Sequence, residues 1–251
     1  MIHPKSLFLL ISLGLVNAAT LPLLAQPSLP SAAPDLTSQP SFKPPPDEGK
    51  PDQTLGAGSR QDNQCFQDAT SATTAPEHSL MALVPASNYG LTLTERPTFF
   101  IALPKTTAKY LILSIRENGI IHHSQSILLI KDSPGIIGIT PSLDAPPLEV
   151  GKEYQWSVVL VCGKKPGPND PAIASWVRRV APPQAMPAQL KKENALAQAI
   201  WYGDQGLWYD ALSALVAAKR AQPQNEAMTD IWSNFLASVG LKEVSSEPLC
   251  F

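Results

Sequence analysis

The chain has 251 residues, of which 44% are hydrophobic, and its formal charge at neutral pH is −2. This length suits one domain of ordinary size with appendages. The near-zero charge argues against a nucleic-acid-binding or anionic-membrane-binding protein, because both need a strong excess of basic residues. Proline is the unusual residue, with 26 copies, about twice the average usage.

Residues 1–25 have the three parts of a secretory signal peptide. Lys5 precedes an apolar run from Leu7 to Val16, and small residues follow, including Ala18 and Ala25. Cleavage after Ala18 or after Ala25 fits equally well. The alternative is an uncleaved membrane anchor, but the apolar run is too short to span a bilayer. We therefore expect a periplasmic, secreted or cell-surface protein without stable membrane insertion after cleavage.

Residues 26–60 contain eight prolines and very few large hydrophobic side chains. Such a segment buries too little apolar surface to offset the entropy lost on ordering. We expect a disordered, proline-rich linker with an extended, semi-stiff backbone. A ligand for an aromatic groove is the alternative interpretation.

Residues 61–183 predict a β-sandwich, because short apolar runs alternate with turn residues. Asn118-Gly119 indicates a tight hairpin between two of these runs. The fold class that follows is α+β, with an antiparallel immunoglobulin-like or fibronectin-like sandwich before a small C-terminal helical hairpin or bundle. The predicted strands are 80–85, 98–104, 109–118, 120–130, 135–141, 153–162 and 174–180.

The run at 153–162 should contribute most to the core. Side chains of equal parity share one face of a strand, so Tyr154, Trp156 and Cys162 lie together. Trp156 stands near the strand centre and is large enough to fill the space between two sheets.

In residues 184–245 the apolar residues recur at the spacing of an α-helix. Residues 246–251 form a tail. Trp232 belongs to an apolar stripe from Met228 to Val239, with Asn225 as a predicted N-cap. A second stripe begins at Trp208, which leaves Tyr209 off the stripe and potentially exposed. A third helix is expected within 187–202.

Several blocks resemble known families. Leu148, Gly151, Tyr154 and Trp156 have the spacing of a motif in fibronectin type III-like domains, and residues 195–225 are similar to one tetratricopeptide repeat. The ordered blocks between residues 56 and 245, among them "ERPTFF", "PLEVGKEYQWSVVLVC" and "LWYDALSAL", resemble a cyanobacterial family of secreted proteins known as domain-of-unknown-function family 928. This resemblance implies a compartment but no activity. A single repeat-like hairpin should pack on the sandwich, and a peptide-binding surface is the alternative.

Three cysteines, Cys65, Cys162 and Cys250, would meet an oxidising environment after export. A bond between Cys65 and Cys162 would close a loop of about 100 residues and contribute roughly 4 kcal/mol in the chain-entropy model. Cys250 would then remain, although it could pair with Cys162 or form an intermolecular bond.

No catalytic, cofactor-binding or metal-binding motif is recognisable. His122 and His123 are adjacent on a strand, so they should point to opposite faces and not share a metal. The best candidate contact site is the loop containing Lys164, Lys165 and Asn169, because loops often carry recognition.

We therefore expect a non-enzymatic interaction or scaffold module whose partner is another envelope protein, with no nucleic acid and no cofactor. The alternatives are a carbohydrate-binding or envelope-polymer-binding module and, less favoured, a hydrolase whose site is assembled from distant residues.

Overall fold

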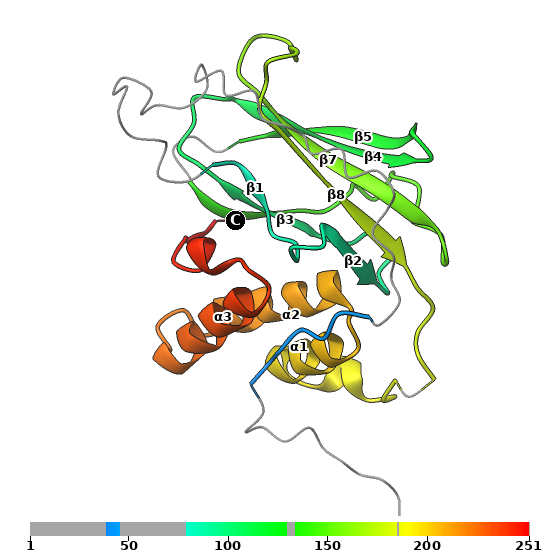
Figure 1. Cartoon of the computed structure of the whole chain (residues 1–251), viewed down its shortest axis with the longest axis vertical. Helices are drawn as coiled ribbons and strands as arrows, with labels where there is room; N and C mark the ends of the chain where they lie inside the picture. The colour runs from blue at the N-terminus through cyan, green and yellow to red at the C-terminus, as the bar shows by residue number, and fades with distance from the viewer. Residues whose placement is uncertain (1–38, 46–78, 130–133, 185, 251) are drawn as a thin grey trace, which may run out of the picture. The chain divides into compact units, whose positions relative to one another are not determined.

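A computed structural model describes residues 39–45, 79–129, 134–184 and 186–250 (Figure 1). The expected signal peptide at 1–25 lies outside these residues. Within them the chain is a mixed α+β structure with two sheets followed by three helices. The four-stranded sheet has the order β1-β3-β6-β9 and the five-stranded sheet the order β2-β8-β7-β4-β5. The strands are β1 (Met81–Ala82), β2 (Tyr89–Thr92), β3 (Phe99–Leu103), β4 (Tyr110–Glu117), β5 (Ile120–Leu128), β6 (Gly135–Ile139), β7 (Glu153–Val161), β8 (Ala172–Arg179) and β9 (Leu249–Cys250).

The core of the sandwich lies between the two sheets, and β7 supplies much of it. Tyr154 and Trp156 are completely buried, and the Trp156 indole stacks on the ring of Phe99 from the other sheet, with centroids 4.7 Å apart. The apolar alternation of β7 places every second side chain on this face. The indole therefore joins the two sheets through an aromatic contact.

The sheets are not purely antiparallel, and this corrects the predicted immunoglobulin-like arrangement. β2 pairs in parallel with β8, and β9 pairs in parallel with β6. The predicted strand at 80–85 is also too long, since β1 has two residues and the chain then turns through Asn88, with φ 56°, into β2 of the other sheet. The predicted tail likewise contains a strand, β9, on the edge of the smaller sheet.

The hairpin between β4 and β5 is confirmed. Asn118 and Gly119 have φ values of 49° and 82°, as the two central residues of a type I′ turn require. The pairing continues from Glu117 and Ile120 to Tyr110 and Leu128, so β5 lies along the whole of β4.

The helices are α1 (Ala195–Asp204), α2 (Trp208–Ala221) and α3 (Glu226–Ser238), with short 3₁₀ helices at Leu190–Lys192 and Lys242–Val244. Asn194 and Asn225 cap α1 and α3 by accepting backbone N–H bonds, which confirms the predicted N-cap at 225. Trp232 is almost completely buried. None of the helices in the described ranges is long and apolar enough to cross a membrane.

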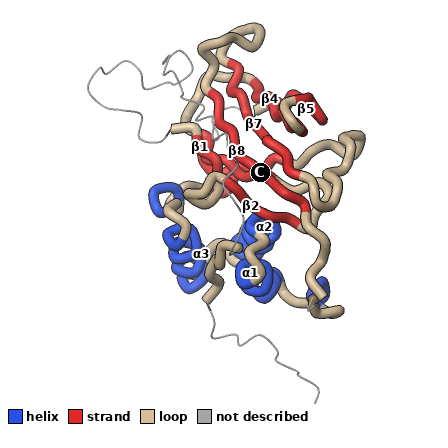
Figure 2. Tube along the Cα trace, turned by 45° about the vertical axis from the view of Figure 1, so that its right-hand side comes forward, coloured by secondary structure: helices blue, strands red, loops and turns tan. Residues whose placement is uncertain are grey.

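The helical unit packs on the sandwich, as the single repeat-like hairpin predicts. α2 lies nearest to β2, and the helices group on one side of the strands (Figure 2). The Trp208 indole N–H donates to the carbonyl of Leu83, 2.9 Å away. Side chains from both sheets and all three helices belong to one continuous apolar core.

Seven residues of the expected linker, 39–45, are described, and they contact the helices. The backbone N–H of Lys43 donates to the carbonyl of Gly203 at 3.1 Å, and the ring of Phe42 meets Trp208 edge-on at 5.0 Å. Residues 39–45 are therefore packed against the helices, whereas the sequence predicts a disordered linker. The rest of that linker lies outside the described residues.

Candidate functional site

Among the residues that the structure describes, β5 lies at an open edge of the sandwich. It pairs with β4 on one side, and it is the last strand of its sheet. Its nine residues, IIHHSQSIL, include no lysine, arginine, acidic residue or proline. Ile120, Ile121 and Leu128 are exposed by 76%, 61% and 83%. Folded proteins usually protect a sheet edge with charges, proline or a covering segment, because unpaired backbone groups attract another strand.

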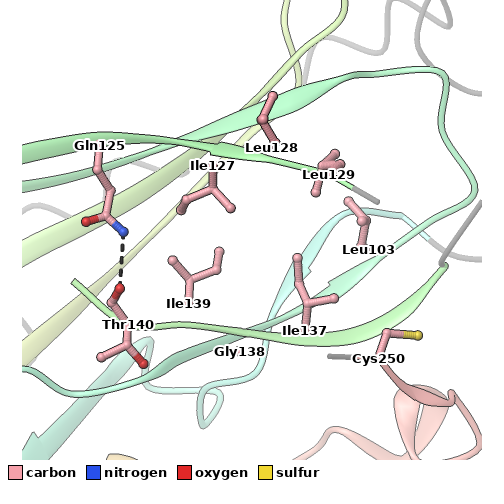
Figure 3. A pocket seen from close by; sticks show the side chains of 10 residues that line it. All are labelled: Leu103, Gln125, Ile127, Leu128, Leu129, Ile137, Gly138, Ile139, Thr140 and Cys250. Atoms are coloured by element: carbon pink, nitrogen blue, oxygen red, sulfur yellow. Dashed lines mark hydrogen bonds between the residues drawn. The ribbon is translucent and has the colours of Figure 1, made fainter. Parts of the chain in front are cut away.

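A cavity of about 310 Å³ opens between β5 and β6. Figure 3 shows Ile127 of β5 pointing towards Ile137 and Ile139 of β6, with Leu103 beside them. The walls are therefore aliphatic and come from both sheets. The remaining lining residues are Gln125, Leu128, Leu129, Gly138, Thr140 and Cys250.

Polar groups at one end of this inter-sheet cleft are already paired with each other. The amide nitrogen of Gln125 donates to the carbonyl of Thr140 at 3.1 Å (Figure 3). The amide oxygen of Gln125 accepts from the backbone N–H of Ser142 at 2.8 Å and lies 2.8 Å from Nε2 of His123. These bonds tie β5 to the segment after β6 and leave the aliphatic part of the cleft as its accessible surface.

The sequence interpretation assumed that His122 and His123 lie in a regular strand, and the structure corrects this. A register shift opposite Ile115 and Arg116 makes His122 an extra residue, so simple alternation of faces fails there. Nε2 of His122 lies 3.2 Å from the carbonyl of Pro146, whereas His123 contacts Gln125. The described residues contain no group of three or more His, Cys, Asp or Glu side chains arranged to hold a metal.

Cys250 borders the other end of the cleft and has a free thiol. Burial, and secondly the charge of Glu247, raises the pKa of this thiol. The suggested alternative bond between Cys162 and Cys250 is therefore wrong for this structure. Cys65 lies outside the described residues, and its bond to Cys162 stays a prediction.

The predicted contact loop connects β7 and β8. Lys164, Lys165 and Asn169 are all exposed. Asp170 braces the loop, since its carboxylate accepts from the backbone N–H of Gly167 at 2.8 Å and of Cys162 at 3.2 Å. The loop follows the end of β7 where Val161 pairs with Tyr110, the residue that also pairs with Leu128 of β5. The loop and the exposed Leu128 thus stand at the same end of the larger sheet.

A second concavity of about 340 Å³ lies between the sandwich and the helices. Its lining includes two charged residues, Arg96 and Asp210 of α2. Asp210 is only 9% exposed. The carboxylate accepts from the backbone N–H of Leu93 at 2.9 Å and from the hydroxyl of Thr94 at 2.8 Å. Burial raises the pKa of Asp210 despite these bonds. We interpret Asp210 as a structural link between α2 and the segment after β2, because its oxygens are occupied by the protein's own donors.

Tyr209 was expected to be potentially exposed, and the structure shows that this expectation is wrong. It is buried, and its hydroxyl accepts from the Trp156 indole N–H at 2.7 Å and donates to the carbonyl of Trp176 at 2.8 Å. Burial raises the pKa of this hydroxyl, so it stays protonated. Sequence reasoning missed it because α2 contacts the sheets on one side and other helices on the other, and such a helix is apolar almost all round.

Three further carboxylates of the described residues, those of Glu95, Glu117 and Glu149, form ion pairs. Lys152 forms ion pairs with Glu117 at 3.0 Å and Glu149 at 2.8 Å. These two bonds, led by that to Glu149, raise the pKa of Lys152. Glu95 pairs with Arg96 on the surface. These ion pairs lie at the protein surface, near turns.

Every tryptophan, tyrosine and phenylalanine in the described ranges is buried or half-buried. The strongly exposed large apolar side chains there are aliphatic, namely Ile120, Ile121, Leu128, Leu143 and Val150. A planar row of exposed aromatics, expected of a carbohydrate-binding face, does not occur in this part of the chain.

Comparison with known proteins gives one finding. The profile of a family described as Domain of Unknown Function (DUF928) matches residues 55–249, a range that includes all three helices and every strand except the last residue of β9. No curated protein and no solved structure matches the chain.

Proposed function

The chain belongs to the DUF928 family, and from this premise we propose that it is an exported protein of the cell envelope that binds another envelope protein without catalysis. The binding surface is the β5 edge, defined as β5 together with the inter-sheet cleft. The observation that carries the proposal is the outer edge of β5, with which no other described strand pairs. Its exposed isoleucines and leucine are not accompanied by any charged residue or proline in the strand.

The partner that fits the β5 edge is an extended segment with alternating apolar side chains. Such a segment would bond to the free backbone groups of β5 and become the sixth strand of the larger sheet. Every second side chain of the added strand would point towards the inter-sheet cleft, where Ile127, Ile137 and Ile139 form an aliphatic wall. Backbone pairing would supply affinity, and the cleft would supply selectivity for aliphatic residues.

Photo-crosslinking tests the location of this surface. A photoreactive amino acid is placed at Ser126, exposed on β5, and in a matched protein at Ala217, exposed on α2. We expect the first to capture an envelope protein in intact cells and the second not to capture it. Leu128→Lys should abolish the product, because a charge on an edge strand disfavours pairing. Equal capture from both positions, recovery of glycans alone, or recovery of this chain alone would contradict the proposal.

Hydrogen exchange then tests the mode of binding. A synthetic peptide with the crosslinked partner sequence is added to the mature protein, and amide exchange is followed in β5 and α3. Strand addition should slow exchange in Ile120–Leu128, because the new strand takes up the free backbone N–H groups. Slower exchange only outside β5 would show that the partner binds another surface.

Export has its own test. The mature protein from its own cells should begin at residue 19 or 26, corresponding to cleavage after Ala18 or Ala25. Without reductant, one thiol, that of Cys250, should react with an alkylating reagent, and mass spectrometry should recover the bond between Cys65 and Cys162. An intact N-terminus with three reactive thiols would rule out the exported state.

A further inference from the structure

Residues 39–45 lie across the helical unit as an extended strap, drawn in blue in Figure 1. The backbone N–H of Lys43 donates to the carbonyl of Gly203 at 3.1 Å, and the Lys43 ammonium lies 2.7 Å from the carboxylate of Asp204. At the other end of the strap, the side-chain amide of Asn234 donates to that of Gln39 at 3.3 Å. The strap thus contacts both α1 and α3.

The helical surface is shaped to admit the backbone of the strap. A Cβ atom added to Gly203 would lie 2.4 Å from the carbonyl oxygen of Ser41, and one added to Gly206 would lie 2.9 Å from that of Lys43. Gly203 stands near the end of α1, where alanine would favour the helix. The close approach of the strap gives a physical reason for glycine at this position.

Side chains of the strap add selectivity. The Phe42 ring meets Trp208 edge-on, with centroids 5.0 Å apart and an interplanar angle of 79°. Trp208 itself stacks on Phe235 of α3 at 5.5 Å. Pro40 is buried, and Pro44 and Pro45 follow the lysine. The strap therefore offers one aromatic ring and one cation between prolines, whose preset extended backbone lowers the entropy cost of binding.

We propose that the surface formed by α1, α3 and Trp208 is a recognition site for extended, proline-flanked Phe-Lys peptides, and that residues 39–45 occupy it as a displaceable ligand of the same chain. The contacts are suited to exchange, because the ion pair is exposed, with 66% and 40% of its side chains accessible, and Phe42 is only half-buried. A partner peptide with this pattern would compete with the strap. This site lies on the helices and is independent of the β5 edge.

The test measures binding of a labelled peptide with the sequence of residues 38–46 to the full mature chain by fluorescence anisotropy. Phe42→Ala combined with Lys43→Glu weakens the internal strap and frees the site. We expect the peptide to bind this double variant at least tenfold more tightly than the wild type, whose tethered strap competes at an effective concentration in the millimolar range. The matched control peptide carries the same two substitutions and should not bind.

Gly203→Ala, added to the double variant, distinguishes recognition from an unspecific effect. It blocks the approach of Ser41 while favouring the helix, so the protein should stay folded and the peptide should no longer bind. Circular dichroism verifies folding. The proposal is overturned if the peptide fails to bind the double variant at 1 mM (about the effective concentration of the tethered strap), binds both proteins equally, or binds undiminished after Gly203→Ala.

Discussion

The two sides of the sandwich differ in how they are covered by the rest of the chain. On the side of β2 and β8, α2 covers the strands. Trp208 bonds to the segment after β1, Tyr209 to β8, and Asp210 to the segment after β2. On the side of β5 and β6, aliphatic side chains face a cleft, and no strand of the described ranges pairs with the outer edge of β5.

The open side is not a general weakness of the fold, because the opposite side is covered by α2. The chain uses a whole helix, with consecutive Trp, Tyr and Asp side chains at its start, to complete one side. It provides no equivalent on the other side within the described ranges. A protein that only needed a stable sandwich would gain from charges or prolines on β5, which is why we relate the open side to binding.

The largest effect should follow Trp208→Ala on the covered side. The indole is fully buried, stacks on Phe235 and donates to the carbonyl of Leu83. We expect the free energy of unfolding to fall by about 3–5 kcal/mol in chemical denaturation, because a large cavity replaces a packed ring. The matched control on the open side is Leu128→Ala, which should change it by less than about 0.5 kcal/mol. Similar losses in the free energy of unfolding for both variants would show that the two sides contribute equally to stability, against this prediction.

A smaller loss should follow Tyr209→Phe, which removes one oxygen and almost no volume. The Trp156 indole N–H and the Trp176 carbonyl would both lose their partner in a buried place. We expect a destabilisation of about 1–3 kcal/mol, measured by urea denaturation. Tyr110→Phe is the matched control, because its hydroxyl lies at the limit of bonding distance, 3.5 Å from the carbonyl of Lys164. An equal effect of the two substitutions would show that the Tyr209 bridge is not made in solution.

Ile127→Ala examines the open side directly. Ile127 is half-buried and borders a cavity that already exists, so its truncation removes few packing contacts. We expect a loss of about 1 kcal/mol. Leu215→Ala in α2, at a fully buried position, should cost about 2–5 kcal/mol. A loss above about 3 kcal/mol for Ile127→Ala would mean that the cleft is closed and packed in solution.

The sequence predicts the positions of most strands better than it predicts which surfaces of the sandwich are covered and which are open. Short apolar runs, alternating in several of them, locate β3 to β8 within a few residues, and Asn118-Gly119 identifies the hairpin, because these signals are local. β2 and β9 were missed because strands of four and two residues carry no clear period and depend on partners distant in the chain, β8 and β6.

The two proposed binding surfaces were harder to predict than the strands. The cleft arises from the spacing between two sheets, which no short pattern encodes. The strap at 39–45 has the composition of a linker, and only the two glycines of the helical unit, at 203 and 206, hint that a backbone must approach there. Tyr209 could have been found from the nearly continuous apolar character of α2, which indicates a helix covered on both sides.

The last and smallest expected effect concerns pH and Asp210 on the covered side. Burial raises the pKa of Asp210 in the folded protein. The folded state therefore keeps a proton that the unfolded chain has already released, and the stability this contributes is complete below the unfolded pKa of about 4 and is lost as pH rises through the folded pKa. Asp210→Asn cannot titrate, so relative to this variant the wild type should lose free energy of unfolding as pH rises from about 4. Asp230→Asn, an exposed aspartate on α3, controls for the change in net charge. Parallel profiles of wild type and Asp210→Asn, or a wild type that gains stability with rising pH, would show that hydrogen bonds from Leu93 and Thr94 outweigh the cost of burying this charge.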